Sequence, residues 1–236
     1  MKLNGIQTFN RAMTFNQNKS QDEQTNAVSK TIIDSLNTNI AKKGSTVIAV
    51  SGGKSPIMLF QKLSQTNLEW DKVTIVLVDE RFLDTQDADS NEKLVRDKLL
   101  INNAVMANFI GLVTTRNIIS SAANANIQIP NIDIALLGMG EDGHTASIFP
   151  CCPEINTIID TELTKVRYTV TTPTNAPHKR IGLSLYALLE IPNLFLSINN
   201  ENKLNIINQA KDKTSLNYPI SYIINNRPDL QIFWYK

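Results

Sequence analysis

His144, one of two histidines in the chain, follows a glycine-rich loop that also contains two carboxylates. The apolar run Ile134–Leu137 leads into this loop and predicts a buried strand whose carboxyl end delivers polar groups to a ligand site, as in open α/β sheets. Imidazole exchanges protons near neutral pH, and a neighbouring carboxylate can fix its tautomer and raise its basicity. We therefore predict that His144 is an acid/base catalyst oriented by Asp142, and that it lies close to the start of a short helix.

Other roles for this loop have weaker support from its residues. A histidine that stands alone is often structural, and that alternative stays open for His144. The glycines at 138, 140 and 143 match the dinucleotide fingerprint G-x-G-x-x-G, but Pro150 and Pro153 leave room for little more than two turns of the helix that the fingerprint requires. Two distant histidines and one adjacent cysteine pair do not have the spacing of zinc ligands. We expect neither a nicotinamide cofactor nor a metal.

A second glycine turn, residues 51–56, has the composition of a phosphate site. A β-branched strand runs into it and a helix over 57–63 follows, with Ser55 as the expected N-cap and Pro56 as the first helical residue. Backbone N–H groups and the dipole at a helix N-terminus bind anions. Ile48 stands where a nucleotide P-loop requires glycine, which favours a small sugar phosphate over ATP. A tight turn without a ligand is an equally open alternative. The candidate phosphate contacts are Ser51, Gly52, Gly53, Lys54 and Ser55.

Charged residues also follow the apolar run 73–78, which predicts a central parallel strand. We expect Asp79 and Arg81 to face the same crevice, with Arg81 holding an oxyanion or phosphate and Asp79 contacting the substrate. Arg180 and Lys203 are further candidate cations. Taken singly, each of these charges is also typical of a solvated surface.

Apolar periodicity predicts strands and helices that alternate along the whole chain. This alternation is typical of an α/β fold in which a mostly parallel sheet is sandwiched between helices, and no linker or repeat interrupts it. We therefore predict one domain over residues 1–236. Further strands are expected near 166–171, 180–185, 194–198 and 230–235, with a weaker one near 5–9, and further helices near 21–43, 91–100, 186–190, 203–210 and 219–225.

The composition limits the classes of function. With 23 basic and 22 acidic side chains and no block of one sign, the sequence has no feature of a nucleic-acid or membrane surface. No apolar run approaches the roughly 18–20 residues that span a bilayer, and the first ten residues lack the apolar core of a signal peptide. Cys151 and Cys152 are adjacent, so no disulfide framework is expected. We predict a soluble, cytoplasmic monomer or small homo-oligomer.

Several segments, in this order along the chain, point to a family: Ser-Gly-Gly-Lys-Ser-Pro at 51–56, Val-Asp-Glu-Arg-Phe at 78–82 with Ser90 and Asn91, Gly-Met-Gly-Glu-Asp-Gly-His-Thr-Ala-Ser-Ile-Phe-Pro at 138–150, Ala-Pro at 176–177 with Arg-Ile at 180–181, and Lys203. They resemble the 6-phosphogluconolactonase family of the glucosamine/galactosamine-6-phosphate isomerase superfamily. The resemblance implies a Rossmann-like parallel sheet with the site at the carboxyl ends of the strands. It also implies hydrolysis of 6-phospho-D-glucono-1,5-lactone to 6-phospho-D-gluconate, in the oxidative pentose phosphate pathway, without metal or cofactor.

The same resemblance implies roles for individual residues. The phosphate contacts would be Gly52, Gly53, Arg180 and Lys203. His144 would take a proton from the attacking water and return it to the ring oxygen of the lactone. Arg81 would stabilise negative charge on the carbonyl oxygen or share the phosphate. Two positions depart from the family pattern, because no glycine precedes Lys203 and Gly182 stands where threonine is more usual.

Two other functions stay open on the sequence. Glucosamine-6-phosphate deaminase shares the fold and the Asp-Gly-His loop, but its loop usually continues toward a Phe-Asn-Glu-Pro-like ending. Here residues 145–150 contain no acidic side chain, which favours the lactonase. A non-catalytic sugar-phosphate sensor would need an output module, and the N-terminal segment shows no helix-turn-helix pattern.

Overall fold

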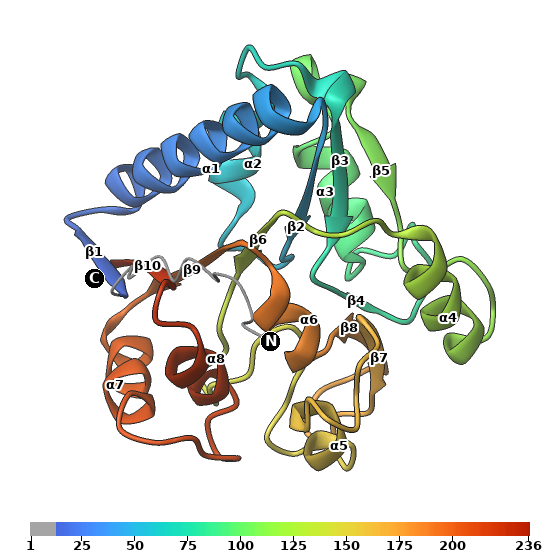
Figure 1. Ribbon diagram of the computed structural model, residues 1–236, viewed down its shortest axis with the longest axis vertical. Helices are drawn as coiled ribbons and strands as arrows, with labels where there is room; N and C mark the ends of the chain where they lie inside the picture. Colours follow the sequence, from blue (N-terminus) through green and yellow to red (C-terminus); the bar gives the residue numbers. More distant parts are fainter. Residues whose placement is uncertain (1–12) are drawn as a thin grey trace, which may run out of the picture.

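A seven-stranded parallel sheet forms the centre of the computed structural model, which describes residues 13–236 (Figure 1). Every pair of neighbouring strands in this sheet is parallel, which confirms the predicted fold class. Its central strands are apolar, β-branched segments that are almost entirely buried, as expected where helices cover both faces. The strand predicted near residues 5–9 lies outside the described residues. In sheet order the strands are β1 (Thr14–Asn18), β10 (Gln231–Tyr235), β9 (Asn193–Asn199), β6 (Ile134–Leu137), β2 (Thr46–Val50), β3 (Val73–Leu77) and β5 (Asn108–Ile110).

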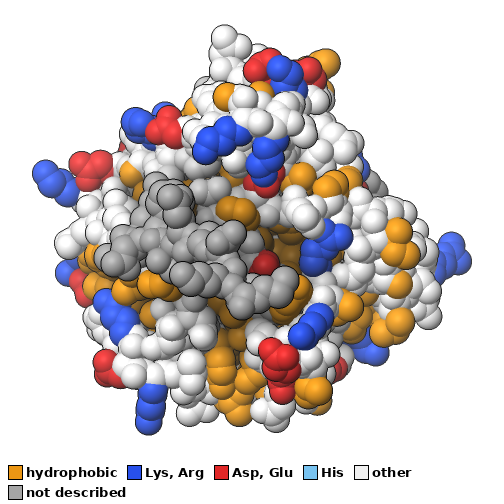
Figure 2. All heavy atoms as spheres, viewed as in Figure 1, with side chains coloured by type: hydrophobic (Ala, Val, Ile, Leu, Met, Phe, Trp, Pro, Cys, Tyr) orange, Lys and Arg blue, Asp and Glu red, His pale blue; other side chains and the backbone are white. Residues whose placement is uncertain are grey.

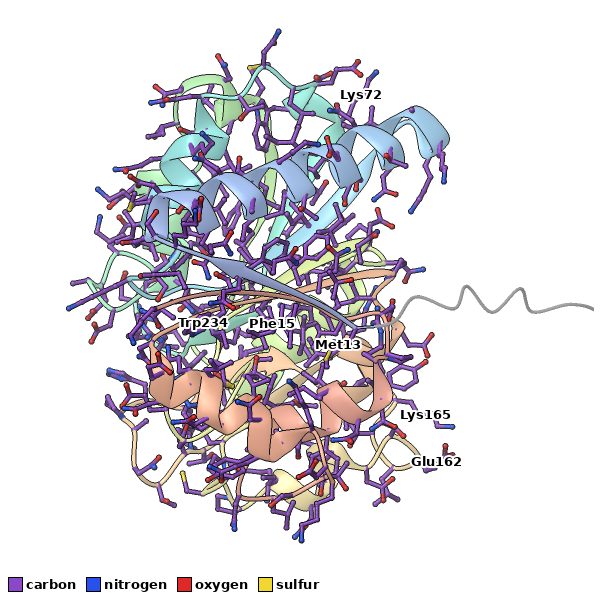
Figure 3. The ribbon with its side chains drawn as sticks, turned by 90° about the vertical axis from the view of Figure 1, so that its left-hand side faces the viewer. Met13, Phe15, Lys72, Glu162, Lys165 and Trp234 are labelled. Atoms are coloured by element: carbon purple, nitrogen blue, oxygen red, sulfur yellow. The ribbon has the colours of Figure 1, made fainter. Side chains whose placement is uncertain are left out.

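Helices lie on both faces of this sheet, as the side view in Figure 3 shows. On one face α1 (Gln21–Lys43) packs against α2 (Ile57–Ser64), and on the other α8 (Ile220–Asn226) packs against α6 (Leu185–Glu190) and α7 (Glu201–Ala210) (Figure 1). Apolar residues of α1 recur at four-residue spacing from Val28 to Ile40 and are buried, which explains why this segment forms a helix against the sheet. The remaining helices are α3 (Asn91–Lys98), α4 (Ile118–Gln128) and α5 (Ile155–Ile159), with 3₁₀ turns at Trp70–Lys72 and Asn102–Met106.

A second, smaller sheet begins where β3 ends. It consists of three antiparallel strands in the order β4 (Asp79–Arg81), β8 (Arg180–Leu183) and β7 (Tyr168–Thr171). Only Val78 separates β3 from β4, so the chain passes directly from the parallel sheet into the small one. The Tyr168 hydroxyl donates to the Leu77 carbonyl at 2.8 Å and ties the two sheets together. The sequence predicts the two longer strands, but neither the second sheet nor a strand at 79–81.

Two local predictions are wrong. Helix α2 has Pro56 as its N-cap and no capping side chain, so Ser55 does not cap it. No helix begins near His144, because Ala146 and Ser147 follow it with φ of +50° and +61°. Two consecutive left-handed residues form a tight turn and cannot start a right-handed helix.

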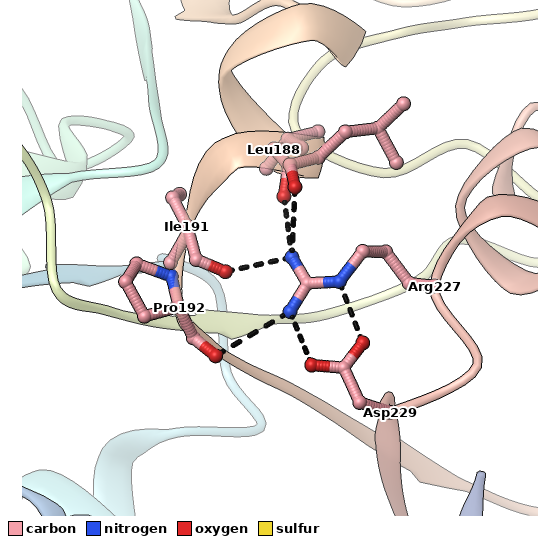
Figure 4. Close-up of polar contacts among 6 residues, drawn as sticks. Leu188, Ile191, Pro192, Arg227 and Asp229 are labelled. Atoms are coloured by element: carbon pink, nitrogen blue, oxygen red, sulfur yellow. Dashed lines mark hydrogen bonds and ion pairs between the residues drawn. The ribbon is translucent and has the colours of Figure 1, made fainter. Parts of the chain in front are cut away.

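A buried arginine fixes the connection between α6 and β9. The Arg227 guanidinium donates to the carbonyl oxygens of Leu188 at 3.1 Å and Ile191 at 2.7 Å (Figure 4). It also donates to the carbonyl of Pro192, and it pairs with both carboxylate oxygens of Asp229 at 2.7 and 2.8 Å. The last carbonyls of a helix lack helical partners, so Arg227 caps the end of α6 and ties it to the segment before β9.

Charged side chains of both signs are interspersed on the face shown in Figure 2. This pattern agrees with the near-balance of 23 basic and 22 acidic residues in the sequence. None of the helices in residues 13–236 combines the length and the apolar character that crossing a bilayer requires.

Candidate active site

A pocket of about 230 Å³ opens at the carboxyl ends of β2, β6 and β9. Strand β4, the loop after β6 and the N-terminal parts of α1, α2, α3 and α7 also contribute to its wall. Ligands of open α/β sheets bind at this edge, and the volume suits a monosaccharide better than a dinucleotide. The pocket brings together most of the site residues predicted from the sequence: Ser51, Gly52, Gly53, Lys54, Ser55, Asp79, Arg81, His144 and Lys203.

The glycine turn after β2 presents unused backbone donors to the pocket. Ser51 anchors the turn, because its N–H and its Oγ both donate to the Leu136 carbonyl, at 3.2 and 3.0 Å. The N–H groups of residues 52–55 donate to no group within residues 13–236, and α2 follows directly. Four free N–H donors directly before a helix are suited to bind an anion, the role that the sequence predicts for this turn.

The loop after β6 holds His144 with one ring nitrogen occupied and the other free. Nδ1 lies 2.5 Å from Oδ1 of Asp142, and the same oxygen accepts the backbone N–H of His144 at 3.1 Å. Burial acts to raise the pKa of Asp142, but the hydrogen bond and the charge of His144 outweigh it, so the pKa is lowered. Because an ionised carboxylate only accepts, Nδ1 is the ring nitrogen that donates to Asp142, and in the neutral imidazole Nε2 then keeps a lone pair. Nε2 has no hydrogen-bond partner among the described residues, and the ring lines the pocket.

Cationic side chains reach the pocket from three elements. Lys54 is exposed, whereas the guanidinium of Arg81 is partly fixed by donating to the Asp89 carbonyl. Lys203 Nζ makes no hydrogen bond or ion pair within residues 13–236; burial lowers its pKa, and Glu141 partly offsets this. A half-buried, unpaired ammonium in a pocket wall is suited to bind an anion from outside the protein. The described residues contain no cluster of three or more His, Cys, Asp or Glu side chains that could hold a metal ion.

Comparison with known proteins identifies the family. A family model described as glucosamine-6-phosphate isomerases/6-phosphogluconolactonase matches residues 19–234. The chain belongs to this family. It is 39% identical over 211 residues to a 6-phosphogluconolactonase of Neisseria meningitidis, covering 87% of this chain and 91% of the relative, and 40% identical over 208 residues to one of Helicobacter pylori, covering 85% and 88%. A solved 6-phosphogluconolactonase structure from Shewanella baltica has a TM-score of 0.87 at 32% identity, covering 95% of this chain and 98% of that one. These similarities confirm the family and the fold predicted from the sequence.

In this member of the isomerase/lactonase family, Arg180 lies beside the pocket and is not part of its wall. It stands opposite Arg81 in the β4–β8 pairing and is only 5% exposed. Its guanidinium donates to the carbonyls of Pro177 at 2.5 Å and His178 at 2.7 Å, and Cζ lies 5.9 Å from the ring centroid of Phe149. Burial, together with the charge of Arg81, lowers the pKa of Arg180. The phosphate contact expected for Arg180 stays a prediction: the loop before β8 engages Nη1, whereas Nε and Nη2 make no hydrogen bond within residues 13–236.

Some residues that shape the site are missing from the sequence prediction. Asn91 lines the pocket, and its Nδ2 donates to the carbonyl of Asp79 at 2.8 Å. Ser147 Oγ donates to the carboxylate of the same aspartate, which fixes Asp79 against the His144 loop. Gln24 Nε2 donates to the carbonyls of Ile198 in β9 and Phe233 in β10, at 2.7 and 2.8 Å, and so ties the start of α1 to these two strands. A glutamine on the apolar face of α1 is the one sequence signal that indicates such a contact.

Proposed function

We propose that this chain hydrolyses 6-phospho-D-glucono-1,5-lactone to 6-phospho-D-gluconate, the lactonase step of the oxidative pentose phosphate pathway. The observation that carries the proposal is the free Nε2 of His144 in the same pocket as the four unused N–H groups of residues 52–55. A base and an anion site in one pocket suit a substrate that has a phosphate at one end and an activated carbonyl at the other. The relatives named 6-phosphogluconolactonase support the same substrate.

In the proposed mechanism, the phosphate binds the N–H groups of residues 52–55 and the ammonium of Lys203. This anchor places the lactone carbonyl carbon beside Nε2 of His144. Water attacks that carbon as Nε2 takes its proton, and Arg81 stabilises the negative charge on the carbonyl oxygen or shares the phosphate. The tetrahedral intermediate then expels the ring oxygen, to which His144 returns the proton. The ester bond is broken, a carboxylic acid is formed and the imidazole is again neutral.

Two carboxylates would assist in different ways. Asp142, whose pKa is lowered, stays ionised and stabilises the imidazolium that forms when His144 takes a proton. Asp79 lies in the pocket wall with its carboxylate held by Ser147 and Asn91, so it can accept a hydrogen bond from a sugar hydroxyl. Neither role requires a cofactor. We further propose that the reaction takes place in the cytoplasm.

The test replaces each histidine separately. We expect His144→Ala to lower kcat by about 10²–10⁴-fold, the usual contribution of general acid/base catalysis. His178→Asn is the matched control, because His178 is exposed with φ of +67° and asparagine tolerates that conformation. Lactone hydrolysis is followed by a coupled assay for 6-phosphogluconate, with the uncatalysed rate subtracted. Near-full activity of His144→Ala would refute the assignment.

Two further assays separate the alternatives. Thr145 Oγ1 donates to the Gly138 carbonyl at 2.8 Å and Ser147 to Asp79, so the turn after His144 brings hydroxyls and no carboxylate of its own toward the site. This composition favours the lactonase over a glucosamine-6-phosphate deaminase. Ammonia release from glucosamine 6-phosphate would overturn that choice, and tight binding of a sugar phosphate without turnover would indicate a sensor.

A further inference from the structure

The His144 imidazole is stacked on the ring of Phe149. The two ring centroids lie 4.2 Å apart with an interplanar angle of 28°, and Phe149 is only 5% exposed. Arg180 approaches the same phenyl ring, with its guanidinium carbon 5.9 Å from the centroid. Phe149 therefore lies in contact with both the candidate catalytic base and a buried guanidinium.

The hydrogen bond to Asp142 does not by itself define the orientation of the imidazole. A single contact at Nδ1 leaves the ring free to tilt about that contact, and a tilt would move Nε2 relative to the pocket. A stacked aromatic ring removes this freedom, since aromatic pairs have preferred geometries and a buried ring has little room to move. The phenyl face also attracts positive charge, so it favours the imidazolium over the neutral ring.

The surroundings of Arg180 indicate a supporting role. Its guanidinium donates to the carbonyls of Pro177 and His178, which anchors it to the loop before β8. A second cation on the Phe149 ring competes for the same π density, so Arg180 does not add to the stabilisation of the imidazolium. What it can supply is a rigid contact that keeps the phenyl ring in place against His144.

We propose that Phe149 and Arg180 are positioning residues for His144: Phe149 sets the plane of the imidazole and stabilises its protonated form, and Arg180 holds Phe149. This inference rests on the proposed function, in which His144 is protonated during the reaction. It differs from the phosphate-binding role implied for Arg180 by family resemblance, because it predicts an effect on kcat and not on substrate binding.

The first test is Phe149→Leu, which keeps an apolar side chain but removes the π face. We expect kcat to fall by about 3- to 30-fold, the range that cation–π and stacking contributions correspond to, with KM changed by less than about 2-fold because the phosphate anchor is untouched. The ring protons of His144 report the stacking directly by NMR, and the His178→Asn background leaves one imidazole to observe. Loss of the phenyl ring current should shift these resonances downfield. Unchanged kcat, or a fall in kcat with unchanged His144 resonances, would overturn the proposal.

The second test compares Arg180→Met with Lys203→Met. We expect Arg180→Met to lower kcat and shift the His144 resonances with little change in KM, whereas Lys203→Met should mainly raise KM. A rise in KM of about 10-fold or more for Arg180→Met, with kcat unchanged, would assign Arg180 to the phosphate and overturn its positioning role. The NMR readout needs no turnover. A downfield shift in Phe149→Leu therefore supports the stacking whatever the activity of His144→Ala. High activity of His144→Ala would refute the proposed role of His144 in catalysis, but not the stacking.

Discussion

Gly140→Ala adds one methyl group where the loop backbone comes closest to His144. A Cβ at this position would lie 2.2 Å from both Cε1 and Nδ1 of the imidazole, and 2.8 Å from Oδ1 of Asp142. Non-bonded carbon atoms ordinarily stay about 3.5–4.0 Å apart. The imidazole would therefore have to retreat by roughly 1 Å or more, and the contact with Asp142 would be lost or lengthened.

The expected loss follows from this displacement. Misplacing a reacting group by about 1 Å can lower the rate by about 10²-fold, so we expect kcat of Gly140→Ala to fall by about that factor. KM should stay within about 3-fold, because the anion site at residues 52–55 is separate from the added methyl. The fold should survive, since the His144 side chain is 32% exposed and can swing away. Gly140 also has no left-handed φ, so alanine adds no backbone strain there.

Gly138→Ala is the matched control in the same loop. A Cβ there meets nothing within 4 Å, so we expect its kcat to stay within a few-fold of the parent. Steady-state kinetics of lactone hydrolysis give kcat and KM, and urea denaturation gives the free energy of unfolding for both variants. Parent-like kcat in Gly140→Ala would refute the reasoning that His144 needs its present position. Equal losses in both variants would show a general effect of the loop instead.

Two further predictions concern stability and pH. Arg227→Met should lower the free energy of unfolding by about 3 kcal/mol, because it leaves buried carbonyls without a donor and removes the ion pair with Asp229. Urea denaturation measures this, and an unchanged midpoint would contradict it. Burial lowers the pKa of Lys203, so its charge is lost at lower pH than for a free lysine. The affinity for 6-phosphogluconate should therefore weaken as pH rises into the alkaline range, and calorimetry should show a weaker, flatter profile for Lys203→Met.

The regular elements of the parallel sheet could be predicted because their determinants are local. The β-branched run over 46–50 and the apolar run over 73–78 match β2 and β3 closely, since strands buried on both faces need continuous apolar sequence. Four-residue spacing of buried residues predicts α1, and Ser90 caps α3 by accepting from the Lys93 N–H. The lengths of these elements follow from side chains that are near one another in the chain.

The second sheet could not be predicted in this way. Strand β4 is three residues long and polar, so its pattern is that of a charged loop. Its pairing with β8 joins residues about 100 positions apart, and no local pattern indicates such a contact. Contacts between distant parts of the chain also surround Arg180, for which its positive charge and the family motif suggest phosphate binding. Its contacts with Phe149 and with the carbonyls of the loop before β8 could not be predicted, because these groups become neighbours only when the small sheet forms.

The presence of glycine at position 182, which departs from the family pattern, also has a reason that only the folded structure shows. Gly182 stands opposite Asp79 in the β4–β8 pairing. A Cβ at Gly182 would lie 2.4 Å from the carbonyl oxygen of Ala146, the first left-handed residue after His144. A threonine in this backbone would push that turn away from the small sheet, and Ser147 would move away from Asp79 with it. The glycine instead lets the turn after His144 pack directly on β8. The small sheet therefore supports the loop that holds His144, while the candidate anion site at residues 52–55 follows a strand of the parallel sheet.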